Sequence, residues 1–370
     1  MNFDFSDDAK ALREQARRFL DERAGPKVAR AQMNGDAPYD TTLWTAIVEL
    51  GWTAARVPEA FGGLDLGADE ACVLAEEIGR SLAPVPFMAT LLATEALVLA
   101  GSDEQQAKWL SGFADGSLVG CTGWGEGTAH SPATSTAKVH GDRITTVKTP
   151  IADLMAADAA IISAHGPDGV QLYLIDLTDP GVTREPEDTL DLVRRHGRLT
   201  LTNAPAQPLG TPAQYHDWLD RAAVLTAFEA LGTAAAAMDM TVAYAKDRTA
   251  FGQKIGRYQG VKHKCADMYI KLELARAHAL HGAWAMQANG GSGAAELRQA
   301  AAAARVASLD ALAYCAEENV QLHGGIGFTW ESDCQFYYRR NRAIVAALGS
   351  RNWWADRLVR ALERRNAAAA

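Results

Sequence analysis

Hydrophobic and polar positions change their period twice along the chain. From Asp4 to about Gly116, apolar residues recur at i, i+3 and i+4, as in "AKALREQARRFLDERA" and "ADEACVLAEEIGRSL", which predicts helices with one buried face. From about Ser117 to Leu209 the period shortens towards two. There, β-branched segments such as "VQLYLIDL" are separated by "HGDR", "HGPDG" and "DPG", which predicts strands joined by turns.

After Pro212 the helical spacing returns and persists. It predicts three long helices, over residues 217–248, 258–289 and 293–325, with Gly290 and Gly291 ending the second one. Alanine-dense helices can approach one another closely, as in a four-helix bundle. The sequence therefore predicts an α+β multidomain chain with an N-terminal helical domain at 1–116, a middle β-barrel-like domain at 117–210 and a C-terminal four-helix bundle at 211–370.

Composition narrows the class of protein. The chain is 48% hydrophobic and 22% charged with a net charge of −9, which argues against a nucleic-acid binder because such proteins need a basic surface. Five cysteines are scattered with no C-x-x-C pair, so we expect reduced thiols in a cytoplasmic protein, with neither disulfides nor a metal site. The N-terminus lacks an apolar signal core. The most apolar run, Pro86 to Gly101, is short for a bilayer and contains Glu95, which favours a buried core helix over a membrane span.

The segment "DRTAFGQKIGRYQG", Asp247 to Gly260, ends one long helix and starts another. An arginine at a helix end beside a glycine turn can hold a phosphate through paired hydrogen bonds, and Arg248 occupies that place. The alternative is a helix-terminal arginine that pairs with the helix dipole and with Asp247.

The segment "QLHGGIGFTWE", Gln321 to Glu331, stops a helix at Gly324 and Gly325. Glycines without a Cβ allow backbone N–H groups to come close to a ligand. The alternative is a plain stop between two helices. The segment is not G-x-G-x-x-G and follows no strand, so a Rossmann interpretation fails.

Taken together, R-x-x-F-G…Q followed by Q-x-x-G-G-x-G, in an α–β–α chain of this length, resembles the acyl-CoA dehydrogenase family. The resemblance covers nearly the whole chain. It implies FAD-dependent α,β-desaturation of an acyl-CoA thioester, in which a glutamate removes the α-proton and the β-hydride passes to the flavin. It also implies a tetramer whose FAD lies across two subunits, and an electron-transfer flavoprotein or similar acceptor.

The resemblance assigns site residues by position. Those matching the family's FAD contacts from a neighbouring subunit are Arg248, Phe251 and Gln259. Those matching the loop on the ADP portion are Gln321, Gly324 and Gly325. The flavin-side motif T-E-P-x-x-G-S-D is replaced by "GCTGWGEGTAHSPATST", and "TTVKTPIAD" lacks the tryptophan of the family's W-I-T segment. Thr122 and Trp124 remain as candidates for flavin contact, and packing inside the β module explains Trp124 equally well.

The catalytic base is the main departure from the family. The usual glutamate-glycine pair aligns with Leu348 and Gly349, and a leucine cannot accept a proton. Branches with the base on the long helix before R-x-x-F-G would place it at Ala222. Asp220 lies two residues earlier, about 200° round a helix, and also fits an N-terminal acid that complements the dipole. Glu229 is the remaining acid on that half of the helix.

Three hypotheses follow. The first is a subunit of an α2β2 acyl-CoA dehydrogenase for lipid or steroid catabolism, in which this chain completes the FAD site and a partner supplies the base. The second is a self-sufficient homotetramer that uses Asp220 or Glu229. The third is a non-catalytic structural or acyl-CoA-binding homologue. Small side chains at Ala222, Ala223 and Ala227 would permit a roomy pocket for a bulky acyl group.

Overall fold

The computed structural model describes residues 4–127, 131–287 and 293–369. The N-terminal helices are α1 (Asp7–Arg23), α2 (Pro26–Asn34), α3 (Thr41–Glu49), η1 (Glu59–Phe61), α4 (Ala68–Ser81), α5 (Phe87–Ala100) and α6 (Asp103–Ala114). The middle elements are β1 (Gly120–Gly123), β2 (Val139–His140), β3 (Arg143–Ala152), η2 (Leu154–Ala156), β4 (Ala159–Gly166), β5 (Gly169–Asp176), β6 (Val182–Glu187), β7 (His196–Pro205) and β8 (Gln207–Leu209). The remaining elements are α7 (Pro212–Asp247), β9 (Thr249–Ala250), β10 (Gln253–Lys254), η3 (Ile255–Arg257), α8 (Gln259–Gln287), α9 (Gly293–His323), η4 (Gly324–Phe328), α10 (Cys334–Ala347) and α11 (Arg351–Ala369).

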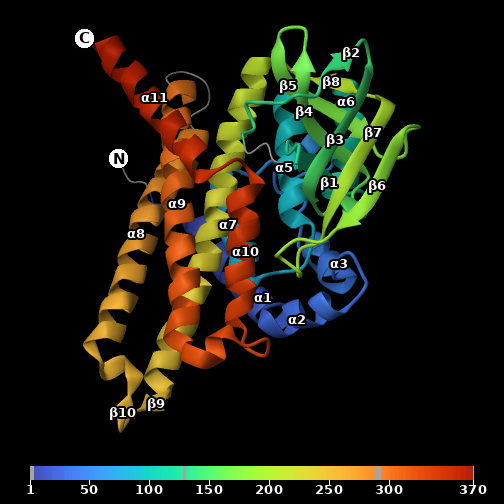
Figure 1. Cartoon of the computed structure of the whole chain (residues 1–370). Helices are drawn as coiled ribbons and strands as arrows, with labels where there is room; N and C mark the ends of the chain where they lie inside the picture. Colours follow the sequence, from blue (N-terminus) through green and yellow to red (C-terminus); the bar gives the residue numbers. More distant parts are fainter. Residues whose placement is uncertain (1–3, 128–130, 288–292, 370) are drawn as a thin grey trace.

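Helix α7 runs through the centre of the molecule, with the strands on one side and α8 and α9 on the other (Figure 1). It begins five residues before the predicted start, because Thr211 and Gln214 form a capping box and Pro212 occupies the first turn. By length and composition α7 could cross a membrane, but 83% of its most apolar window is buried inside the protein. The apolar run that the sequence assigned to the core is α5, whose residues 87–97 are all buried.

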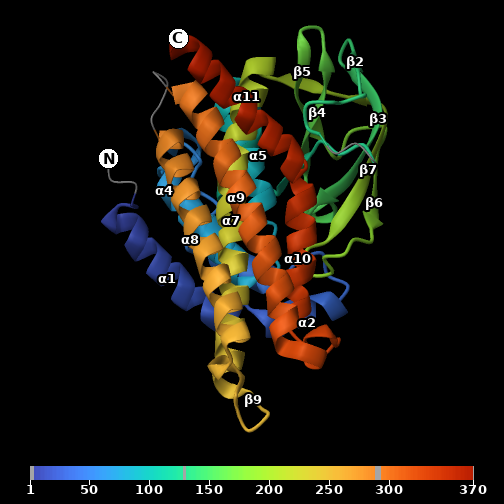
Figure 2. The ribbon, with the colours of Figure 1, turned by 60° about the vertical axis from the view of Figure 1, so that its left-hand side comes forward.

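The helices α7, α8, α9, α10 and α11 form the C-terminal part, and α8 and α9 lie side by side in both views (Figures 1 and 2). The α7–α8 connection projects as a small β9–β10 hairpin at the end far from the sheets. Helix α9 ends at His323, close to the predicted stop at Gly324 and Gly325. The predicted glycine stop of α8 at Gly290 and Gly291 lies outside the described residues.

The middle part contains two open four-stranded sheets, so the expectation of a barrel-like domain is wrong. The strand orders are β1-β4-β5-β8 and β2-β3-β7-β6, with β1 parallel to β4. Within the described residues, isolated bridges join the sheets at Glu126–Thr149 and Lys138–His165. The edge strands β2 and β8 have two and three residues, too few to extend a ladder from one sheet to the other.

Helices α4 and α7 approach each other so closely that their backbones are in contact. A Cβ on Gly79 would lie 2.1 Å from the carbonyl oxygen of Glu229, and one on Gly232 would lie 1.8 Å from that of Glu76. Thr233 Oγ1 also donates to the Gly79 carbonyl at 3.0 Å. Since only glycine permits this approach, the two helices hold Glu229 at a fixed position relative to the N-terminal domain.

Candidate functional site

A cavity of about 430 Å³ lies between the β module and helices α5, α7 and α10. Its wall is largely apolar, with Met88 and Leu92 from α5, Trp124 after β1, and Val345 from α10. Its polar side chains include Asp191, Arg194, His196, Glu229 and Arg342. The cavity therefore combines an apolar chamber with a group of charges.

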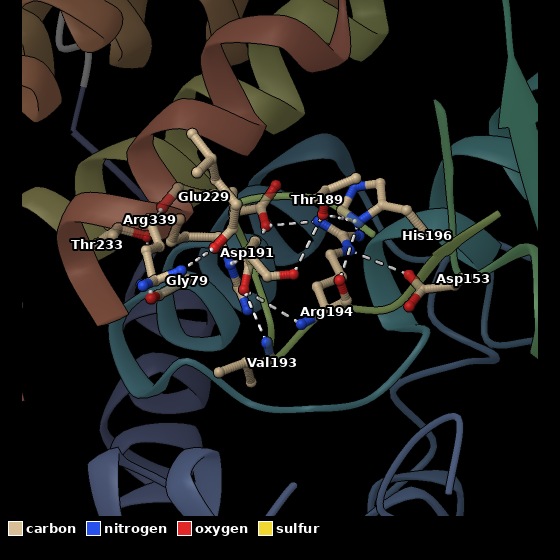
Figure 3. A network of polar contacts seen from close by, with 12 residues as sticks. Gly79, Asp153, Thr189, Asp191, Val193, Arg194, His196, Glu229, Thr233 and Arg339 are labelled. Atoms are coloured by element: carbon tan, nitrogen blue, oxygen red, sulfur yellow. Dashed lines mark hydrogen bonds and ion pairs between the residues drawn. The ribbon is translucent and has the colours of Figure 1, made fainter. Parts of the chain in front are cut away.

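Arg194 is the centre of that group of charges (Figure 3). It donates from Nε to Asp153 Oδ2 at 3.0 Å and from Nη1 to Glu229 Oε1 at 2.9 Å. Arg340 Nε pairs with Asp191, and its Nη1 lies 3.9 Å from Glu229 Oε1. Every carboxylate in this network faces an arginine. The pairs join the 188–196 segment to Asp153 after β3, to Glu229 of α7 and to Arg340 of α10.

A third arginine, Arg305, completes the charge balance. It is fully buried on α9 and donates from Nη2 to the Ile344 carbonyl. Glu229 acts electrostatically on it. Three arginines and three carboxylates (Asp153, Asp191 and Glu229) therefore make up an almost wholly buried, electrically balanced cluster. Such a cluster is costly to break on one side.

The cluster sets the protonation of its members. Burial disfavours the charged form of Arg194, but Glu229 and Asp153 outweigh burial and raise the pKa of Arg194. Burial lowers the pKa of Arg305 to about 10 and lowers that of His196 below its usual value. His196 is thus neutral at pH 7, whereas Arg194 and Arg305 are charged.

Glu229 is the candidate base that reaches the cavity wall. Its carboxylate accepts from Arg194 and lies near Arg340, so it is already engaged by arginines of this chain. Asp220 is not part of the cavity wall. It accepts from Arg357 of α11 at 2.7 and 3.0 Å and lies 3.5 Å from Arg298 Nε. Burial raises the pKa of Asp220 although Arg357 opposes this shift.

Leu348 lies directly beside the cavity but is not part of its lining. Its neighbours Ala347 and Gly349 line the wall, whereas the Leu348 side chain is fully buried in the hydrophobic core. The Trp354 indole donates to the Leu348 carbonyl at 2.6 Å, and Gly349 has a φ of +82°, which favours glycine. At this turn, where the resemblance places a glutamate, the Leu348 side chain therefore packs into the core instead of facing the cavity.

The end of β1 and the residues after it stand where the resemblance places the flavin-side motif. Thr122 and Trp124 both line the cavity, and the Trp124 ring lies 6.2 Å from the buried ring of Trp218, so Trp124 has both packing and cavity contacts. Glu126 points away into the β module and is held by Lys148 and by Ser135 Oγ at 2.6 Å. Although burial opposes it, these hydrogen bonds lower the pKa of Glu126 to about 2.

The residues assigned to the ADP portion gather at the far end of the helices. Thr241 Oγ1 donates to Asn319 Oδ1 at 2.9 Å, and the rings of Tyr244 and His323 stack 4.1 Å apart. These contacts bring the end of α7, with Arg248, next to the end of α9, with Gly324.

This far end is open. Three of the assigned side chains, in and just after the α7–α8 connection, are exposed: Arg248, Phe251 and Gln259. Phe251 is 97% exposed. Gln321 is also exposed, and a Cβ on Gly324 or Gly325 would meet no atom within 4 Å. An exposed arginine beside accessible backbone fits the diphosphate of an ADP group. The surface faces outward, so it suits a ligand carried by a neighbouring molecule.

Comparisons with known proteins agree with this architecture. Residues 6–117 match the acyl-CoA dehydrogenase N-terminal domain, and residues 212–363 match the acyl-CoA dehydrogenase C-terminal domain. A protein of Mycolicibacterium smegmatis named acyl-CoA dehydrogenase IpdE2 is 33% identical over 93% of this chain and 95% of its own length. The chain belongs to the acyl-CoA dehydrogenase family.

Two solved structures extend the comparison to heteromers. One, described as a Tcur3481–Tcur3483 steroid acyl-CoA dehydrogenase (ACAD) variant, has a TM-score of 0.89 and 32% identity, over 97% of this chain and 99% of the other. The other, the ChsE4–ChsE5 complex of Mycobacterium tuberculosis, has a TM-score of 0.89 and 25% identity, over 98% and 99%. Each is a chain of a named pair.

For an acyl-CoA dehydrogenase chain, the charged cluster is the feature that the sequence did not reveal. Asp191 and Arg194 lie in "DLVRR", between two predicted strands, and this was the available signal. Asp153 and Arg340 are far from that segment in the sequence, and none of the four residues belongs to a motif. The small residues expected to shape a pocket, Ala222, Ala223 and Ala227, are fully buried and are not part of the cavity lining.

Proposed function

We propose that this chain is one subunit of a heteromeric, FAD-dependent acyl-CoA dehydrogenase, which completes the FAD site while a partner supplies the base. The observation that carries the proposal is Leu348, which stands where the family has a glutamate and is buried in the core. Glu229, the acid on the cavity wall, is held by Arg194. A chain arranged in this way needs a proton acceptor from elsewhere.

The exposed apolar side chains support a partner. Tyr269, Ile270 and Leu274 of α8 are 54–60% exposed, and Phe328 and Trp330 beside the ADP-side surface are 89% and 51% exposed. Large apolar groups gathered on a soluble protein's surface mark contacts with another chain. The named pairs among the related structures point to a second acyl-CoA dehydrogenase as that chain.

In this assembly the residues of this chain bind and orient. Arg248 and Gln259 hold the diphosphate of an FAD whose ring lies in the partner, and the backbone at Gly324 and Gly325 approaches the same group. Bound FAD supplies the hydride acceptor for desaturation. The partner's carboxylate removes the α-proton. The substrate is a bulky acyl-CoA, in keeping with the steroid enzyme among the relatives, and electrons leave to an electron-transfer flavoprotein or similar acceptor in the cytoplasm.

The test is expression of this chain alone and together with a base-bearing family member encoded beside it. We expect the single chain to purify without stoichiometric flavin and the pair to co-purify as a yellow heteromer that bleaches on addition of an acyl-CoA. If the chain alone forms a flavin-loaded tetramer that acyl-CoA reduces, the proposal fails. A colourless heteromer would favour the non-catalytic alternative.

A further inference from the structure

The segment between η4 and α10, residues 329–333, carries a tryptophan that is held in place from two sides. Trp330 is 51% exposed and follows Gly324 and Gly325 of the ADP-side surface. A large side chain that is already fixed loses less conformational entropy when it binds a partner. The contacts that fix Trp330 therefore bear on what this segment can bind.

The backbone of the segment is held by Arg30 of α2, which lies beside the start of α10 in both views (Figures 1 and 2). Its Nη1 donates to the Trp330 carbonyl at 3.0 Å, and its Nη2 donates to the Glu331 carbonyl at 2.9 Å and to Asp333 Oδ1 at 2.7 Å. The guanidinium carbon lies 5.0 Å from the centre of the buried Phe336 ring. One planar group thus fixes the course of the segment.

The ring of Trp330 is held by Arg339 of α10. The Arg339 guanidinium carbon lies 5.0 Å from the centre of the ring, which is within the range of a cation–π contact. Nη1 of the same guanidinium donates to the Leu190 carbonyl at 3.0 Å, so the cation is itself held in place. Trp330 is therefore fixed both at its backbone and at its ring.

Two further apolar side chains precede Trp330 on the same surface. Ile326 is 54% exposed and Phe328 is 89% exposed. Between them, a Cβ on Gly327 would lie 2.4 Å from the Val320 carbonyl oxygen, so this part of the loop packs closely against α9. Large apolar side chains presented from a fixed backbone are typical of the anchors that dominate protein–protein interfaces.

We propose that Arg30 and Arg339 are positioning residues that hold Trp330 as a preformed anchor for an apolar depression on the partner subunit. The partner is the base-bearing acyl-CoA dehydrogenase chain of the proposed function, on which this inference rests. Trp330 adjoins the ADP-side surface, where the FAD of that proposal crosses between the two chains. Because Arg30 comes from α2, the N-terminal domain supports an interface that the C-terminal helices carry.

The first test uses the purified chain and needs neither flavin nor partner. Arg30→Met removes the hydrogen bonds to the segment and should speed amide hydrogen exchange of Thr329 and Ser332 about tenfold, the size of effect expected for one hydrogen bond to a charged donor. Both amides donate within the segment, to the carbonyls of Ile326 and Thr329. Unchanged exchange at these amides overturns the positioning role.

Arg80→Met is the matched control for exchange. Arg80 also pairs with a partly exposed carboxylate, Asp239 of α7, at 2.7 Å. Its side chain is 23% exposed, against 29% for Arg30. Exchange in the 329–333 segment of this variant should match that of the unaltered protein. Equal acceleration in both variants would reflect a general loss of stability and would contradict the assignment.

The second test measures the dissociation constant of the co-expressed pair by sedimentation. Trp330→Ala should raise it about 100-fold, as for an interface anchor, and Arg30→Met about tenfold, because the anchor must then be ordered on binding. Leu64→Ala, at a site 49% exposed in the N-terminal domain, should leave it unchanged.

The outcomes of this second test separate the two proposals. If the unaltered pair forms and Trp330→Ala binds as tightly, the anchor is wrong and the proposed heteromer stands. If the unaltered pair does not form, the proposed heteromer fails and the anchor fails with it, whereas the exchange result on the single chain still decides whether Arg30 positions the segment.

Discussion

Glu229 lies within α7 and Arg248 caps its C-terminal end, about 28 Å away at the rise of an α-helix. The two charges are in opposite situations. Around Glu229 each carboxylate of the buried cluster is paired with an arginine of the same chain. Arg248 is exposed, and its side chain has no protein partner in the described ranges. Charges satisfied internally stabilise the fold, whereas a charge left open at an exposed end is suited to a ligand from outside. The buried charges thus stabilise this chain, whereas the exposed Arg248 is available to a molecule outside it.

The largest effect should come from placing a carboxylate at the position of the lost base. Leu348→Glu should lower the free energy of unfolding by about 4 kcal/mol, because the new side chain enters the core. Urea unfolding measures this loss, and Leu190→Glu, at a site 59% exposed, should be nearly neutral. A stable Leu348→Glu protein that reduced flavin with acyl-CoA would show that this side chain can turn into the cavity.

The next largest loss of stability should come from removing a carboxylate of the buried cluster. Glu229→Gln removes the carboxylate between Arg194 and Arg340 and should cost about 3 kcal/mol, since it leaves buried guanidinium groups short of negative charge. Thermal and urea unfolding report the change, with Glu363→Gln on the exposed face of α11 as the neutral control. Unchanged stability would mean that the cluster is not the joint between the domains.

Stability measured as a function of pH tests another carboxylate that is paired within the chain, Glu126. The folded-state pKa of Glu126 is about 2, below the value of about 4.3 in an unfolded chain, so its contribution is present above pH 4.3 and is lost as pH falls towards 2. Glu126→Gln should cost about 2 kcal/mol at pH 6 and almost nothing near pH 2. A difference that stays constant over this range would rule out ionised Glu126 as the cause.

The smallest effect on stability should come from the open end. Arg248→Ala should change the free energy of unfolding by less than about 0.5 kcal/mol, as for other exposed sites. In the co-expressed heteromer, however, it should lower the flavin content, measured from the absorbance spectrum. Arg257→Ala, an exposed arginine one short segment away, should leave flavin content unchanged. Equal flavin content in both variants would contradict a role for Arg248 in holding the diphosphate.

Much of the fold could be predicted because it follows local periodicity. The change from helical spacing to alternation and back gave the order of helices, strands and helices, and the glycines after Gln321 marked the end of α9. The barrel expectation failed because sheet closure depends on the length and pairing of edge strands such as β2 and β8, which alternation alone does not specify.

The candidate site was predictable where it depends on motifs and hidden where it depends on packing. Spacing located Arg248 and Gly324, and the structure places them at one end of the molecule; their roles remain predictions. The alignment located Leu348 but not the direction of its side chain, which Gly349 and Trp354 determine. Pairing of Arg194 with Asp153 and Glu229 requires three distant segments to meet, and no single sequence records that meeting.

The contact between α4 and α7 has a consequence for descent. Gly79 and Gly232 each face a carbonyl of the other helix, so a side chain at either position would separate the two helices and move Glu229 relative to its arginines. Related lineages that retain the cluster should retain both glycines together, and those that lose one should have lost the other and the cluster as well. Gly79 and Gly232 should therefore be kept or lost together during evolution.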